Sequence, residues 1–108
     1  MTEDEARTVL LARKAELAEE DSMSAEARAP VTLQQDSVGR LSRMDAMQGQ
    51  AMALAAERRR ESERQRILGA LARIDEGEWG YCLTCGEGIA AARLGNDPSV
   101  AKCVGCAG

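Results

Sequence analysis

Two Cys-x-x-Cys pairs near the C-terminus constrain this chain more than any other feature. The four cysteines are Cys82, Cys85, Cys103 and Cys106, so seventeen residues separate the two pairs. A Cys-x-x-Cys turn brings two thiolates together, and two such turns at this spacing can surround one tetrahedral Zn²⁺ with four sulfurs. Because four sulfur ligands leave no position for water or substrate, the sequence predicts a single structural zinc.

Disulfide bridges and a redox dithiol are the alternatives to a metal site. No signal peptide or apolar leader stands at the start of the sequence, so we expect a cytoplasmic, reducing environment, which argues against disulfides. A thioredoxin-like dithiol belongs to a βαβ unit, and nothing upstream of Cys82 has the pattern of a strand. Zinc is therefore the preferred interpretation.

The composition offers little else to hold the chain together. The 108 residues include no Phe, one Trp and one Tyr, and 30% of them are charged. Alanine dominates the apolar residues, which favours helix but buries little area. We therefore expect a mostly α fold, an elongated, coiled-coil-like antiparallel helical hairpin with a small C-terminal four-cysteine zinc finger. No apolar run reaches the length of a membrane span, and the net charge of −4 disfavours direct binding to nucleic acid.

The hairpin is predicted to occupy residues 1–76 and the zinc finger residues 77–108. Thr2 and Glu5 have the spacing of a capping box, in which the hydroxyl of the first residue accepts a bond from the backbone three residues later. A first helix is therefore expected over residues 2–20, with acidic residues at the positive end of its dipole.

A turn is expected to follow over residues 21–31. This segment is rich in Ser, Ala and mixed charge, and it contains Pro30, which disfavours helix in the residue before it, although helix could still extend almost to this proline. Thr32 and Gln35 then form a second capping box. A long helix is predicted over residues 33–75, because no proline interrupts it.

Five apolar residues of the long helix recur at helical spacing: Leu41, Met44, Met47, Ala51 and Leu54. We interpret them as a packing face that the first helix covers. The protein is expected to be a monomer, although the sequence leaves open whether the hairpin self-associates through this Met and Ala seam.

A cluster of five arginines follows in the same helix: Arg58, Arg59, Arg60, Arg64 and Arg66. Glu61 and Glu63 lie among them, and Glu57 directly precedes them. The ordinary interpretation of such a run is a solvated helix face with pairs three or four residues apart, and a surface that binds a partner is the alternative.

Glycines and aromatic residues mark the start of the predicted finger. Gly77 is expected to end the long helix. Trp79 and Tyr81 are the two aromatic residues of the chain, and we expect both to pack around the metal site. Gly86 and Gly105 are expected to take positive φ, so that backbone N–H groups point at the sulfurs.

The C-terminal third resembles the DksA/TraR-type zinc finger proteins of bacteria, also described as DnaK suppressor protein-like. The matching positions are Ala70-Leu71-Ala72-Arg73-Ile74, Gly77, Trp79-Gly80-Tyr81-Cys82, Cys85-Gly86, Ile89, Arg93-Leu94, Pro98 and Cys103-x-x-Cys106. The resemblance implies zinc on the four cysteines and a hairpin that enters the secondary channel of RNA polymerase. Its members regulate transcription without binding DNA, either together with the alarmone ppGpp or in its place.

The hairpin tip departs from that family. Members carry an Asp-x-x-Asp-x-Ala pattern there, whereas the nearest acids in this chain are Asp36 and Asp45. The resemblance therefore leaves two functions open, a secondary-channel regulator and a zinc-stabilised helical interaction module without DksA-like regulatory activity. An enzyme is not expected, because the sequence has no His and all four thiolates would be bound to the metal.

Overall fold

The computed structural model describes residues 1–28 and 40–107. Most of these residues lie in four helices: α1 (Glu3–Arg28), α2 (Arg40–Glu76), α3 (Ala91–Asn96) and α4 (Val104–Ala107). Within these described ranges the only β-structure is an isolated antiparallel bridge between Tyr81 and Gly88. The expectation of a mostly α fold is confirmed. In the same ranges, no helix is apolar enough over sufficient length to cross a membrane.

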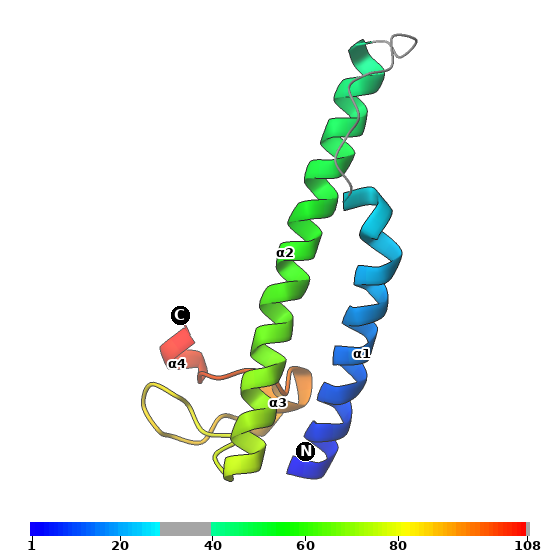
Figure 1. The fold of residues 1–108 in the computed structure, drawn as a ribbon. Coiled ribbons are helices and arrows are strands. Elements are labelled where there is room, and N and C mark those ends of the chain that lie inside the picture. The colour runs from blue at the N-terminus through cyan, green and yellow to red at the C-terminus, as the bar shows by residue number, and fades with distance from the viewer. Residues whose placement is uncertain (29–39, 108) are drawn as a thin grey trace.

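Helices α1 and α2 lie side by side and antiparallel, and the short helices α3 and α4 sit with the connecting loops near the C-terminal end of α2 (Figure 1). An ion pair of 2.8 Å joins Arg7 to Asp75 near this end, and Asp21 pairs with Arg60 further along. The molecule measures 60 × 27 × 20 Å. Because α2 has 37 residues and α1 has 26, part of α2 extends past the end of α1.

The start of α1 follows the predicted capping box. The backbone N–H of Glu5 donates to the Thr2 hydroxyl at 3.2 Å, and the N–H of Ala6 donates to the Thr2 carbonyl at 2.9 Å. The far end of α2 follows prediction as well. Gly77 takes φ of 74°, and Glu78 N–H donates to the Arg73 carbonyl at 2.8 Å, which closes the helix.

The end of α1 differs from the main sequence prediction and agrees with the alternative, in which helix extends almost to Pro30. The helix continues to Arg28 rather than ending at residue 20, so residues 21–28 of the predicted turn are helical. These eight residues contain no Gly or Pro, and tertiary contacts to α2 stabilise them despite their polar composition. The predicted capping box at Thr32 and Gln35 lies outside the described residues.

An apolar seam joins the two helices next to the finger. Leu10 and Leu17 are seven residues apart on α1, and Ile67 and Ile74 are seven residues apart on α2. All four side chains are at most 5% exposed, and they belong to one core cluster. Seven-residue spacing is the pattern of a coiled coil, so this part of the hairpin packs like one.

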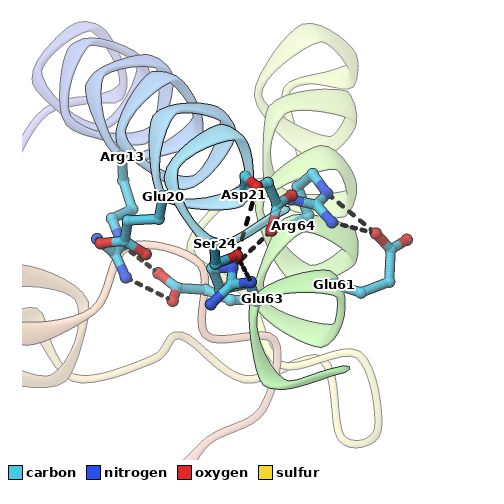
Figure 2. A network of polar contacts seen from close by, with 8 residues as sticks. Arg13, Glu20, Asp21, Ser24, Glu61, Glu63 and Arg64 are labelled. Carbon is cyan, nitrogen blue, oxygen red and sulfur yellow. Dashed lines mark hydrogen bonds and ion pairs between the residues drawn. The ribbon is translucent and has the colours of Figure 1, made fainter. Parts of the chain in front are cut away.

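Ion pairs join the two helices beside this apolar seam and beyond it (Figure 2). The Arg13 guanidinium donates to both carboxylate oxygens of Glu63, from Nε at 2.7 Å and from Nη2 at 3.0 Å. This paired geometry holds the pKa of Glu63 below its ordinary value. Arg13 interrupts the apolar stripe of α1 in the sequence, and the structure shows that it instead links the two helices.

Asp21 forms the second ionic contact between the helices. Its carboxylate accepts hydrogen bonds from Arg60 Nε and from Arg64 Nη1, and Arg60 Nη2 donates to the Ser24 hydroxyl at 2.8 Å. The side chains of Asp21, Arg60 and Arg64 are only 24%, 13% and 20% exposed. Hydrogen bonds from Arg60 and then from Arg64 lower the pKa of Asp21. Two guanidinium groups therefore fix the distal end of α1 to α2.

Replacing Asp21 with Asn is expected to lower the free energy of unfolding at neutral pH, because two partly buried arginines lose their shared anion. The pKa of Asp21 is lower in the folded protein than its ordinary value of 3.8. The stabilisation is therefore complete above that ordinary value and is lost as the pH falls through the folded pKa. The difference between wild type and Asp21→Asn should shrink below about pH 4 in urea unfolding measured at a series of pH values.

Glu19→Gln provides the matched control, because Glu19 is exposed on the same helix and forms no ion pair among the described residues. Its unfolding curve should match that of wild type at neutral pH. An unchanged gap between Asp21→Asn and wild type from pH 7 to pH 3 would contradict the assigned role of this carboxylate.

The methionine-containing stripe of α2 does not face α1 at the positions that the structure describes, contrary to the sequence prediction. The side chain of Leu41, its first predicted member, lies outside the described side chains. Met44 is 55% exposed, Met47 50% and Leu54 37%. Arg60 faces α1, and Ala53, seven residues before it, continues that side of the helix. Leu54 is the next residue, so it lies about 100° around the helix from the inner face. The first helix therefore packs on small and charged residues of distal α2 and leaves the stripe outside.

Candidate metal centre

The first cysteine pair lies on a tight hairpin. Cys82 N–H donates to the Glu87 carbonyl at 2.8 Å, and Gly86 N–H donates back to the Cys82 carbonyl at 2.9 Å. Gly86 has φ of 77°, as predicted, which lets the chain turn back immediately after Cys85. The backbone N–H of Thr84 points at Cys82 Sγ, 3.4 Å away. This turn therefore presents two sulfurs and a backbone donor on one side.

The second cysteine pair lies at α4. Cys106 N–H and Ala107 N–H both donate to the Cys103 carbonyl, at 3.1 and 2.9 Å. Gly105 is within this helical turn and does not have positive φ, so that prediction was wrong. One helical turn already places residues three apart on the same side, and no left-handed residue is needed. Leu83 N–H donates to the Ala101 carbonyl at 2.9 Å and joins the two turns.

The fold brings all four cysteine sulfurs together. Every pair of these Sγ atoms lies within 4.8 Å, and Cys85 Sγ and Cys103 Sγ are 3.7 Å apart. A tetrahedral ion with metal–sulfur distances of about 2.3 Å requires sulfurs about 3.8 Å apart. Cys82 is 3% exposed, whereas Cys85 is exposed at the surface. The arrangement can hold one metal ion, with an exposed edge through which an ion could enter.

The electrostatics of the cluster favour a cation. Hydrogen bonds from the backbone of Cys103, then of Cys85, lower the pKa of Cys82 to about 5, so this sulfur is a thiolate at neutral pH. The neighbouring sulfurs of Cys103, Cys82 and Cys85 raise the pKa of Cys106 to about 12. Four thiolates this close repel each other, and protons remain on some of them unless a cation takes their place.

Trp79 connects the cysteine module to the hairpin. Its indole Nε1–H donates to the Pro98 carbonyl at 2.9 Å, and its side chain is 7% exposed. It belongs to the same core cluster as Ile74, Ile89 and Leu94, as expected for the only Trp of the chain. Tyr81 was expected to pack there too, but it is 56% exposed. One aromatic ring therefore supports the module and the other points to solvent.

The five arginines of the predicted basic cluster do not form one free surface. Arg60 and Arg64 face α1 and pair with Asp21, so they belong to the hairpin seam. The side chains of Arg58, Arg59 and Arg66 are exposed, and Arg66 makes one long contact of 3.4 Å with the Ser62 hydroxyl.

Asp21 and Ser24, which accept hydrogen bonds from Arg60, were not predicted from the sequence as functional or structural contacts. Their spacing could have identified them. Asp21 lies four residues after Leu17 and Ser24 three residues after Asp21, so both continue the inner face of α1.

The two acids predicted near the hairpin tip are not brought together as a described pair. Asp45 is exposed, and it lies in the second turn of α2. Asp36 lies outside the described residues. Asp45 is the only acid between residues 40 and 56 of α2.

The fold and the site together define a helical hairpin with a four-cysteine module at its base, whose sulfurs could hold one metal ion. A solved structure with this DksA-like fold is that of transcription factor DksA2 from Pseudomonas aeruginosa, with a TM-score of 0.78 and 22% sequence identity. The match covers 97% of this chain and 79% of the DksA2 chain. No protein-family model and no curated protein matches the sequence.

Proposed function

We propose that this protein is a zinc-binding transcription regulator of the DksA/TraR type that acts on bacterial RNA polymerase through its secondary channel. The observation that carries the proposal is the likeness to transcription factor DksA2 over 97% of the chain, hairpin and cysteine module included. The net charge of −4 supports action on a protein partner rather than on DNA.

The residues that would hold the metal are Cys82, Cys85, Cys103 and Cys106, and an all-sulfur set of this geometry suits Zn²⁺. When bound, zinc would cross-link the two cysteine turns and complete a closed, structural site. The module then fixes the base of α2 through Trp79 and the apolar residues around it. In this proposal the metal supports the hairpin and takes no part in any reaction.

The shape of the molecule suits insertion into a narrow channel. The hairpin gives the molecule a long axis of 60 Å against cross-sections of 27 and 20 Å. Arg58, Arg59 and Arg66 are exposed on the shaft and would meet acidic residues at a channel rim. The distal part of α2, with Asp45, would then point inward.

A second candidate is favoured by the composition of the tip. The chain has no Asp-x-x-Asp-x-Ala pattern. A protein of this build could bind RNA polymerase, or another partner, without changing transcription. This alternative is a zinc-stabilised helical interaction module of the same lineage.

Replacing Asp36 and Asp45 together with Ala separates these two candidates. A regulator that acts through tip carboxylates should lose most of its effect on transcription from purified polymerase while its helical circular dichroism stays unchanged. Glu19→Ala, an exposed acid on the shaft, is the matched control and should retain the effect. A wild-type protein without any effect on transcription would support the second candidate.

A further inference from the structure

An apolar stripe on distal α2 has no part in the proposed function. The stripe consists of Met44, Met47, Ala51 and Leu54, spaced three, four and three residues apart as in a coiled-coil seam. All four residues are exposed. From residue 44 to residue 56 the only charged residue is Asp45, in a chain in which 30% of residues are charged. An exposed coiled-coil seam of this kind is typical of a helix that pairs with another helix.

We propose that the stripe pairs with the same stripe of a second copy of this chain, in an antiparallel dimer centred near Gly49. In this register Met44 packs against Leu54 of the second copy, and Met47 packs against Ala51. Each layer then combines a large side chain with a smaller or differently shaped one. A parallel pair would instead place Met47 against Met47 and Ala51 against Ala51, which crowds one layer and leaves a void at the other.

The charges beside the stripe favour the same arrangement. Arg43 and Glu57 are fourteen residues apart, so both lie on the same flank of the stripe. Each is partly buried, and neither forms an ion pair among the described residues. In an antiparallel pair like flanks meet, so Arg43 of each copy lies next to Glu57 of the other. A parallel pair would place Gln48 and Ala55 on the opposing flank instead, with no ion pair.

The dimer needs only the part of α2 around and beyond the end of α1. Fourteen residues from Arg43 to Glu57 span about 21 Å of helix, and the fingers lie at opposite ends of the assembly. From residue 57 to residue 66, eight of ten residues are charged, which confines the apolar contact to the distal half. This self-association goes beyond the proposed function and does not depend on polymerase binding.

Sedimentation equilibrium of the zinc-loaded chain from about 1 to 500 µM tests the proposal. A reversible monomer–dimer equilibrium is expected. Met47→Glu should raise the dimer dissociation constant at least about tenfold, because each copy places one substituted side chain in the interface. Met52→Glu is the matched control, since Met52 is 71% exposed on the same helix but outside the stripe. A monomer at every concentration, or an equal loss with Met52→Glu, would overturn the dimer.

A charge exchange tests the direction of pairing. Arg43→Glu and Glu57→Arg should each weaken the dimer, and the double variant should restore it to within about threefold of wild type. Circular dichroism checks that all variants keep their helix content. A double variant as weak as the single ones would exclude the antiparallel register. If the chain stays monomeric and Met47→Glu instead weakens binding to purified RNA polymerase, the stripe belongs to that partner and the dimer is wrong.

Discussion

Removal of bound zinc with a strong chelator is expected to unfold the cysteine module and to weaken the whole molecule. The apolar residues of this module are few, and Trp79, Ile89 and Leu94 share one core cluster with the hairpin. Zinc binding to modules of this size contributes on the order of 10 kcal/mol, more than such a core can supply. Emission from Trp79, which is 7% exposed when folded, should shift to the red, and helical circular dichroism should decrease.

Addition of zinc after removal of the chelator should restore both signals and release protons, because Cys106, with a pKa of about 12, carries a proton without the metal. Cys103→Ser should reproduce the effect of the chelator. The control is Thr84→Ala, an exposed residue between two cysteines whose side chain is not a predicted ligand. An unchanged Trp79 emission in the metal-free protein would contradict a structural metal.

Replacement of Ile67 with Ala is expected to cost roughly 2–5 kcal/mol of folding free energy. Ile67 is 1% exposed and lies in the core cluster with Leu10 and Leu17 of α1. Truncation removes apolar contacts and leaves a space that close-packed helices fill only in part. The total free energy of unfolding of a domain of this size is about 5–15 kcal/mol. The variant should therefore unfold at a much lower urea concentration than wild type.

Leu68→Ala is the matched control for this substitution. Leu68 is the next residue of α2 and is 41% exposed, so its loss should cost about 0.5 kcal/mol or less. Equal costs at both positions would mean that the apolar seam through Ile67 does not hold the hairpin together.

The sequence correctly predicted the start of α1 and the end of α2, because interactions between neighbouring residues determine both. The capping box at Thr2 and Glu5 starts α1, and Gly77 closes α2 with the positive φ that glycine allows. The four cysteines were predicted to meet, and their sulfurs lie together. In each case the controlling interaction is between residues close in sequence or has a fixed chemical spacing, so the sequence alone carries the information.

Contacts between α1 and α2 determine two features that the sequence alone could not predict. These are the end of α1 and the direction in which the Met44 to Leu54 stripe faces. Residues 21–28 have the composition of a turn, yet the bonds from Arg60 and Arg64 to Asp21 stabilise this segment as helix. Those partners are about forty residues away. Likewise, periodicity identified the Met44 to Leu54 stripe but not the direction it faces, because that depends on which side of α2 packs against α1. Hydrophobicity suggested the inner side, whereas the inner side of distal α2 consists of small and charged residues.

The most direct test of the proposed function is equilibrium binding of the zinc-loaded protein to purified bacterial RNA polymerase, with a known secondary-channel factor as competitor, at two salt concentrations. The proposal predicts saturable binding at micromolar concentrations that the competitor displaces, and weaker binding at the higher salt because exposed arginines contribute. No binding at micromolar concentrations, or binding that the competitor does not displace, would contradict action in the secondary channel.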